Sequence, residues 1–209
     1  MSPNRSTPRV LRRIATLLLT LALFGALAYA QSGVGVSPPR VEHFTAPGQS
    51  ITETVFVDNP SGSSPLEVSI SVSDALFQPD GKMLYMPPRS HASSAAQWLS
   101  LSNLDFVLAA EEAQEVNYTL DVPEDAPDGT YWTAIFFESN APGQGEGQGI
   151  GVETRVRVGH IVYAHVGEVT RSGEIQGFRY QEPVDEPSSV RVSFSNTGNG
   201  LVRVEGHVE

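Results

Sequence analysis

From about residue 33 onward, apolar and polar residues alternate along most of the chain, and this alternation limits the possible folds more than any other feature. The clearest case is residues 66–72, where Leu, Val, Ile and Val alternate with Glu, Ser and Ser. Successive side chains of a β-strand point to opposite faces, so the pattern predicts strands with one face buried. Turn residues separate such segments at intervals of about eight to twelve residues, which is typical of a β-sandwich. The sequence therefore predicts an all-β protein.

Two segments stand out within this pattern. Residues 150–158 form the longest alternating strand, and Thr154 completes a row of apolar residues on one face: Ile150, Val152, Val156 and Val158. Residues 131–137 are instead almost continuously apolar, which indicates a strand at the centre of a sheet. We expect Trp98, Phe136 and Val156 to be buried in one sandwich. Tyr131, after Asp128-Gly129, resembles a tyrosine corner, which is a structural feature.

A domain boundary is expected near Gly167, after which the alternating segments become shorter. The strand candidates beyond it are residues 175–180, 190–194 and 201–208. Three strands do not close a second sandwich. We therefore interpret residues 31–166 as an immunoglobulin-like β-sandwich and residues 167–209 as the start of a second β-sandwich domain. Either the sequence is a fragment, or a partner supplies the missing strands.

Residues 1–30 have the layout of a secretory signal peptide. Arginines come first, an apolar run of 15 residues follows, and the segment ends in Ala28-Tyr29-Ala30. A positive region, an apolar region and a small-residue cleavage site in this order are typical of export signals. The run is shorter than the roughly 20 residues that span a bilayer. We expect cleavage after Ala30 and export to the periplasm or the cell envelope and surface; an uncleaved anchor is the alternative.

The charge of the chain excludes two classes of partner. Loss of residues 1–30 removes four of the 13 basic residues and none of the 24 acidic ones, so the net charge of the remainder is near −15 (9 minus 24). Such a surface repels phosphate backbones and anionic lipid headgroups. We expect no nucleic-acid partner and no membrane contact beyond the signal peptide.

The sequence carries no motif of an enzyme. Without cysteine there is no disulfide, no thiol nucleophile and no cysteine-bound metal. The five histidines lack zinc-site spacing, and no serine lies in a Gly-x-Ser-x-Gly elbow. The acidic residues within 121–128 match no EF-hand loop, and a solvated turn is the preferred interpretation. We expect no catalytic residue, no cofactor and no metal.

Several short motifs follow one another in a recognisable order. Ser37-Pro38-Pro39-Arg40-Val41 precedes Pro47-Gly48-Gln49-Ser50 and Val57-Asp58-Asn59-Pro60, and the series continues with Trp98-Leu99, Val122-Pro123 and Asp128-Gly129-Thr130-Tyr131. In this order the motifs resemble the pilus-type (PapD-like) periplasmic chaperones over residues 33–166. The resemblance implies an immunoglobulin-like fold, a role in pilus assembly and no enzymatic activity.

The chaperones that the chain resembles bind by strand addition, in which a long strand completes the groove of a subunit that lacks one strand. The resemblance implies that the apolar row of residues 150–158 faces such a subunit. In the family, a cleft arginine and a cleft lysine hold the subunit's C-terminal carboxylate. Arg40 matches the arginine, whereas His160 stands where the lysine would be. His160 therefore departs from the pattern, because a neutral imidazole is a weaker partner for an anion than an ammonium group.

Two functions remain open. One is a periplasmic chaperone-like module that binds an exported protein subunit by strand addition. The other is a structural or adhesive envelope module of a longer, multi-domain surface protein. In that case residues 150–158 form an ordinary core-facing strand and Arg40 is a solvated loop residue. The full-length gene distinguishes the two, because a chaperone ends after the second sandwich and a surface protein continues.

Overall fold

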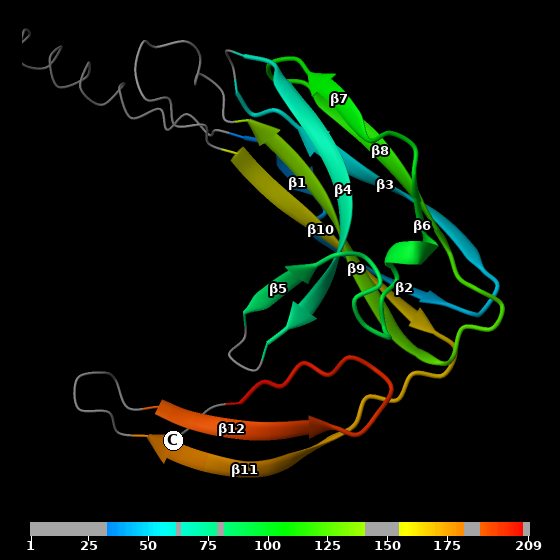
Figure 1. Ribbon diagram of the computed structural model, residues 1–209, viewed down its shortest axis with the longest axis vertical. Coiled ribbons are helices and arrows are strands. Elements are labelled where there is room, and N and C mark those ends of the chain that lie inside the picture. Colours follow the sequence, from blue (N-terminus) through cyan, green and yellow to red (C-terminus); the bar gives the residue numbers. More distant parts are fainter. Residues whose placement is uncertain (1–32, 62–63, 79–81, 141–154, 182–188, 207–209) are drawn as a thin grey trace, which may run out of the picture. The chain divides into compact units, whose positions relative to one another are not determined.

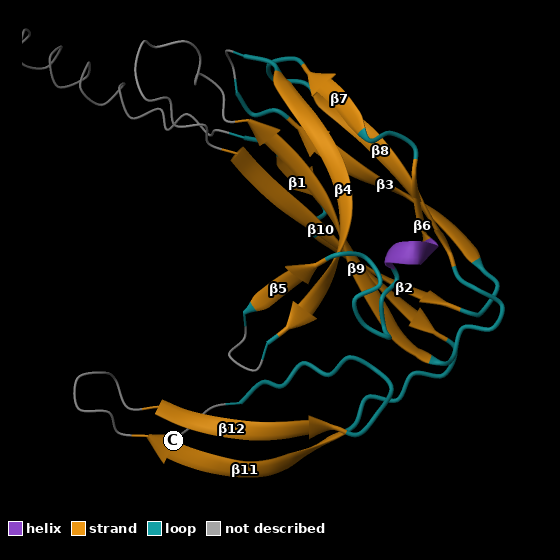
Figure 2. Ribbon diagram, viewed as in Figure 1, coloured by secondary structure: helices purple, strands orange, loops and turns teal. Residues whose placement is uncertain are grey.

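The computed structural model describes residues 33–61, 64–78, 82–140, 155–181 and 189–206. Within these ranges the regular structure consists of β-strands and one short 3-10 turn, η1 (Ala96–Trp98) (Figure 2). The all-β fold expected from the alternation is therefore confirmed. No helix in this part of the chain is long and apolar enough to cross a membrane. The expected signal peptide, residues 1–30, lies outside the described residues.

The first sheet of the sandwich has four strands among the described residues. Their order across the sheet is β1 (Gly35–Ser37), β3 (Ser50–Asp58), β8 (Ala113–Asp121) and β6 (Leu99–Leu101). All neighbouring strands in this sheet pair antiparallel. The alternation in β3 and β8 turns Val55, Val57 and Val116 inward, where they are fully buried.

The second sheet contains the longest strands. Its order is β2 (Arg40–Thr45), β10 (Arg155–Val166), β9 (Gly129–Asn140), β4 (Leu66–Phe77) and β5 (Met83–Met86), and β7 (Asp105–Leu108) also pairs with β4. β9 lies between β10 and β4, as its continuous apolar sequence predicts (Figure 1). β2 and β10 pair parallel, whereas the other pairs in this sheet are antiparallel.

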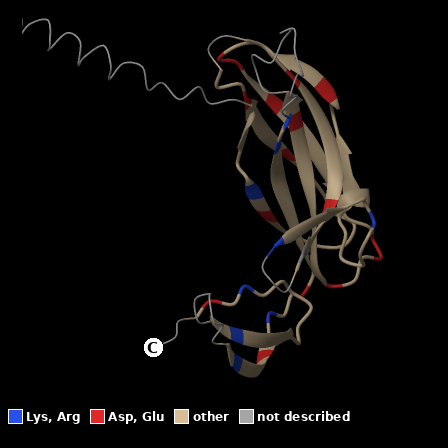
Figure 3. Ribbon diagram, turned by 60° about the vertical axis from the view of Figure 1, so that its left-hand side comes forward, with Lys and Arg blue, Asp and Glu red and all other residues tan. Residues whose placement is uncertain are grey.

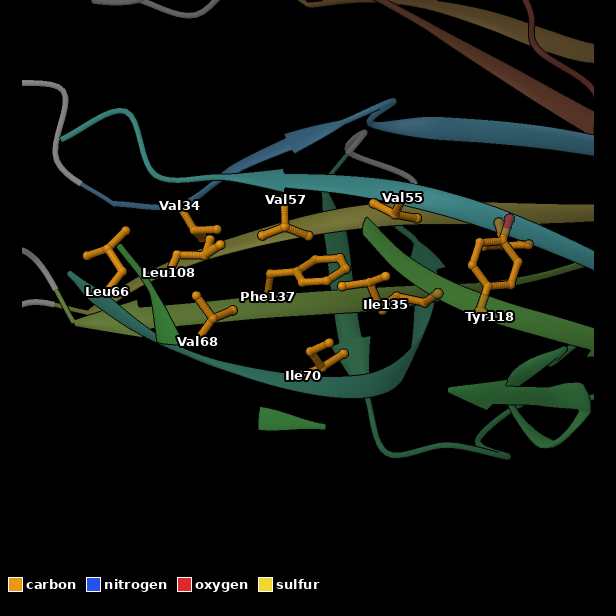
Figure 4. Packing of buried hydrophobic residues seen from close by; sticks show 12 residues of the cluster. Val34, Val55, Val57, Leu66, Val68, Ile70, Leu108, Tyr118, Ile135 and Phe137 are labelled. Atoms are coloured by element: carbon orange, nitrogen blue, oxygen red, sulfur yellow. The ribbon is translucent and has the colours of Figure 1, made fainter. Parts of the chain in front are cut away.

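The hydrophobic core lies between the inward faces of the two sheets. Figure 4 shows Val57 and Phe137 packed in it from opposite sheets, with Val68 and Leu108 nearby. Each fully buried side chain of this size stabilises the fold by roughly 1.5–3 kcal/mol. Because the chain has no cysteine, this core stabilises the sandwich without disulfide bonds. The observed architecture is an immunoglobulin-like β-sandwich, as the sequence predicts.

Two of the sequence motifs have a structural explanation. Asn59 is buried, and its side-chain amide donates hydrogen bonds to the carbonyl oxygens of Ser64, Leu108 and Ala109, so it fixes the turn after β3. The hydroxyl of Tyr131 donates to the carbonyl oxygen of Pro127 at 2.9 Å. A tyrosine that bonds to the backbone a few residues upstream is the geometry of a tyrosine corner.

Two of the three side chains expected in the core are buried. Trp98 is 6% exposed and Phe136 is 3% exposed. Phe136 lies on the outer face of its sheet, where the ring of Tyr85 packs edge-on against it at 4.6 Å between centroids. Val156 is only half-buried, so its expected burial is wrong in degree. The reason is its position near the unpaired end of β10, where no further described strand covers it.

Beyond Gly167 the described residues contain a separate two-stranded sheet. β11 (Gly173–Gln181) and β12 (Ser189–Asn196) contain the first two strand candidates, residues 175–180 and 190–194, and they pair antiparallel. Residues 201–206 form no strand, which corrects the expected third strand, and the N–H of Leu201 donates to the Thr130 hydroxyl at 3.2 Å. One face of this sheet is largely apolar and exposed, with Ile175, Phe178, Tyr180, Val190 and Val192. The proposed division at residues 166 and 167 stays a prediction.

Candidate functional site

The edge of β10 is unpaired over its first half. β2 pairs with β10 only from Ile161 onward, and the first hydrogen bond of this ladder runs from the Ile161 N–H to the Pro39 carbonyl at 3.0 Å. Over residues 155–160, no strand in the described part of the chain pairs with this edge, although β9 pairs with the opposite edge along the whole length. Figure 1 shows β2 beside the later part of β10. An unpaired strand edge is a template for another strand.

The backbone groups available at this edge follow from the ladder itself. Because the N–H of Ile161 points toward β2, the N–H and C=O groups of Arg157 and Gly159 point to the same side. These groups are directed toward the space that β2 would fill if it were longer. A strand added there would continue the row that β2 begins at Arg40.

The side chains of β10 alternate between the core and the outer face. The inward row begins with Val156 and Val158 and continues with His160 and Val162. Val158 packs against the main core cluster. Val156 contacts Gly33, where a Cβ would lie 2.7 Å from the valine; this glycine also has a φ of +108°, in the left-handed region. Ile150 and Val152, also assigned to the candidate site, lie outside the described residues.

Arg40 is the first residue of β2 and lies on the outer face of the sheet. Its register partner on β10 is Ile161, which alternates with the inward-facing His160. The Arg40 side chain is 54% exposed, and its Nε lies 4.0 Å from the Glu42 carboxylate. This is a loose ion pair, so the guanidinium at the head of the unpaired edge remains accessible.

His160 lies in the core and does not join Arg40. It is 1% exposed, and its Nδ1 lies 2.6 Å from the Pro38 carbonyl, so Nδ1 carries the proton and donates it. Its Nε2 has no hydrogen-bond partner among the described residues. Burial lowers the pKa of His160, and His43 lowers it further, although the hydrogen bond to Pro38 acts in the opposite direction. His160 is therefore a neutral core histidine, and it faces away from Arg40.

Two arginines outside the sequence motifs lie beside the unpaired edge. Arg155 and Arg157 alternate with Val156 and Val158, so they face outward. Arg155 pairs with Glu138 at 3.3 Å. The guanidinium of Arg157 lies 3.8 Å from the centre of the Phe136 ring and donates to the Ser73 hydroxyl. The period-two pattern of β10 was the signal that could have placed Arg155 and Arg157 on one face of this strand, opposite Val156 and Val158.

These arginines contrast with the rest of the sandwich. Figure 3 shows acidic residues in red on many of its strands and only a few basic residues in blue. The outer face near the unpaired edge is thus a local exception in an acidic chain. A local positive charge of this kind favours an anionic group on a partner.

Glu42 lies on the same outer face, two residues after Arg40. Its Oε1 accepts a hydrogen bond from Arg203 at 3.0 Å, and its Oε2 lies 3.3 Å from the Nε2 of His165. Partial burial would raise the pKa of Glu42, but its bonds to Arg203 and His165 hold it below the ordinary value. Glu42 is therefore ionised at neutral pH. Within the described residues, no cluster of three or more potential ligands could hold a metal ion.

Comparisons with known proteins identify similar folds and no family. No protein-family model matches the sequence, and no curated protein matches it. PapD-like domain 7 of human CEP192 matches with 12% identity and a TM-score of 0.44 over 80% of this chain and 97% of that chain. The class 5 fimbriae chaperone CfaA matches with 14% identity and a TM-score of 0.48 over 80% and 68% of the two chains.

A third similar structure is the Salmonella enterica SafA pilin in complex with the SafB chaperone. It matches with 16% identity and a TM-score of 0.45, over 72% of this chain and 64% of that chain. PapD-like fimbrial chaperones, the family that the sequence motifs resemble, are thus among the similar structures. At these identities and TM-scores the likeness concerns the fold alone.

Proposed function

We propose that this chain is a chaperone-like module that binds an extended segment of an exported protein by strand addition to residues 155–160 of β10. One observation carries the proposal. β2 pairs with β10 only from Arg40 onward, so half of the β10 edge has no partner strand within the described residues. Backbone hydrogen bonds would supply affinity at this edge, and the alternating side chains would supply selectivity.

The direction of the added strand follows from the position of Arg40. A strand parallel to β10 would run toward β2 and end at Arg40 with its C-terminal carboxylate. An antiparallel strand would begin there with its amino group, which the guanidinium repels. A charge-assisted hydrogen bond from Arg40 to a carboxylate favours the parallel direction. The partner would therefore be an exported protein with a free, extended C-terminus.

The two faces of β10 indicate the composition of the partner. Inward side chains of an added strand would cover the half-buried Val156 and lie next to Val158. Outward side chains would lie beside Arg155 and Arg157. We expect a segment in which apolar residues alternate with polar or acidic ones. In this proposal the chain acts without catalysis, in the periplasm or cell envelope, after loss of residues 1–30.

A structural envelope module is the second candidate. It is favoured by the contacts of Val158 with the main core cluster and of Val156 with Gly33, because they give the inward row a role within the sandwich itself. In that case the unpaired edge binds no partner. The two candidates differ in one measurable property, which is the binding of an extended peptide at this edge.

The test is a selection from a library of random ten-residue peptides displayed with free C-termini. The exported protein, residues 31–209, is the bait, and the most enriched peptide is synthesised for titration. Arg157→Pro removes one N–H from the unpaired edge, whereas Arg157→Ala removes the same side chain and keeps the N–H. Strand addition predicts weaker binding to Arg157→Pro than to Arg157→Ala. Equal affinity for the two variants, or no enriched peptide, contradicts it.

A further inference from the structure

Glu42 is an internal carboxylate within reach of Arg40. The two residues are two positions apart on β2, so they share the outer face, and Glu42 Oε1 lies 4.0 Å from the Arg40 Nε. Under the proposed function, Arg40 receives the carboxylate of a partner. Glu42 would compete for the same guanidinium unless other groups hold it.

Two other groups, His165 and Arg203, bind the Glu42 carboxylate. His165 is 3% exposed, and its Nδ1 lies 2.9 Å from the Thr130 hydroxyl. That hydroxyl oxygen accepts the N–H of Leu201, so its own proton is free to point at Nδ1. The Nε2–H of His165 then donates to Glu42 Oε2. Burial lowers the pKa of His165, which is consistent with a neutral ring in this tautomer.

The other carboxylate oxygen of Glu42 accepts a hydrogen bond from Arg203. The Arg203 Nη2 donates to Glu42 Oε1 at 3.0 Å, which is 1.0 Å shorter than the contact between Arg40 and the same oxygen. Both oxygens of Glu42 are therefore engaged by groups other than Arg40. Arg40 and Arg203 outnumber Glu42 by one positive charge, and Arg171, whose Nη2 lies 3.3 Å from the Nε2 of His165, adds a second.

We infer that Glu42 and Arg203 are positioning residues, which together keep the Arg40 guanidinium available to the terminal carboxylate of a bound strand. The inference rests on the proposed function and adds an account of what keeps Arg40 available for binding. Loss of Arg203 leaves Glu42 bound to His165 alone and lowers the net positive charge of the cluster by one. Glu42 then pairs with Arg40 and opposes the incoming carboxylate.

The experiment uses the peptide selected above in two forms, with a free C-terminal carboxylate and with a C-terminal amide. Wild type is expected to bind the free form more tightly. Arg203→Gln is expected to weaken binding of the free form by about two- to fivefold, the range of an exposed ion pair, and to leave the amide unchanged. Arg203→Lys is expected to retain most of the preference, since it keeps the charge.

Two further variants separate this inference from general effects. Arg179→Gln on β11 removes the same charge from an exposed position and is expected to have no effect. Glu42→Gln in the Arg203→Gln background is expected to restore binding of the free form, because the competing carboxylate is gone. Thermal melting of each variant checks that the fold is retained.

Each outcome has a defined meaning. If wild type prefers the free form but Arg203→Gln retains the full preference, or Glu42→Gln restores nothing, the inference is wrong and the proposed function stands. If wild type binds both forms equally, Arg40 does not bind the terminal carboxylate. The inference about Glu42 and Arg203 is then wrong as well. Strand addition itself is then decided separately by the comparison of Arg157→Pro with Arg157→Ala.

Discussion

The Nδ1 of His160 on β10 donates a hydrogen bond to the carbonyl oxygen of Pro38, 2.6 Å away in the segment that joins β1 to β2. This bond links the long strand to the point where the chain leaves one sheet and enters the other. His160 is also one of the largest fully buried side chains of the sandwich. Its burial and this hydrogen bond give His160 a role in the stability of the sandwich.

We predict that His160→Ala lowers the free energy of unfolding by about 2–4 kcal/mol, because it leaves a cavity and removes the hydrogen bond to Pro38. Urea unfolding at neutral pH measures the change. Glu115→Ala, at an exposed position of β8, is the control and is expected to change stability by less than about 0.5 kcal/mol. A His160→Ala variant as stable as this control would contradict the structural role.

Acid should destabilise the sandwich through three buried histidines. Burial lowers the pKa of His43, His160 and His165 below their ordinary value of 6.5. The unfolded chain then binds more protons than the folded chain as the pH falls below about 6.5, so the free energy of unfolding decreases. The stability is fully present above that pH and is lost as the pH falls toward the lowered pKa values.

Urea unfolding at pH 8, 7, 6 and 5 measures this loss. Burial also raises the pKa of Tyr118, so its hydroxyl stays protonated and can donate to His43 Nε2 at 3.0 Å over the whole range. His43→Gln keeps a side chain that can accept this bond and does not titrate. The variant is expected to lose less stability than wild type between pH 7 and pH 5. An identical pH profile would exclude His43 as a source of the effect.

The two ends of the inward row of β10 should respond differently to the same substitution. Val162 is fully buried, whereas Val156 is half-buried beside Gly33. A charge at position 162 has no access to water, so Val162→Asp is expected to unfold the domain. Val156→Asp is expected to cost less, about 1–2 kcal/mol, because the carboxylate can reach solvent at the unpaired edge. Equal losses in thermal or urea unfolding would contradict the openness of this edge.

The fold could be predicted from the sequence because alternation is a local signal. Long strands such as β3, β4 and β8 show it within a few residues, and the continuous apolar run of residues 131–137 correctly indicated the central β9. The same alternation predicts that the His160 side chain faces inward, because His160 follows Val156 and Val158 at every second position. Its position in the resembled family instead implies a role beside Arg40, on the opposite face of the sheet.

Other parts of the site could not be predicted in this way. The parallel pairing of β2 with β10 joins residues more than 100 positions apart, and no local pattern encodes where that ladder starts. The partial exposure of Val156 depends on where β2 begins, so it follows only from the structure. The contacts of Glu42 with His165 and Arg203 are likewise non-local.

The exported protein should begin at Gln31. The arginine-rich start, the short apolar run and Ala28-Tyr29-Ala30 predict cleavage at this bond. Expression in an export-competent bacterial host, followed by N-terminal sequencing and intact mass of the envelope fraction, measures it. Ala30→Leu, which places a bulky residue at the cleavage site, is expected to slow processing. A mature protein that retains residues 1–30 would contradict the signal-peptide interpretation.

Arg40→Ala should weaken binding of the selected peptide and leave the fold intact. The Arg40 side chain is 54% exposed, so water and salt reduce the strength of its bond to a carboxylate. We therefore expect a loss of about 0.5–1.4 kcal/mol, or roughly two- to tenfold in Kd, for the free C-terminal form and no loss for the amide. The effect should decrease at high salt, because exposed charges are screened. Arg191→Ala on β12 is the matched control, since it removes the same side chain from another exposed strand position. An Arg40→Ala variant that binds the free form as tightly as wild type, while melting at the same temperature, would favour the envelope module over the chaperone-like role.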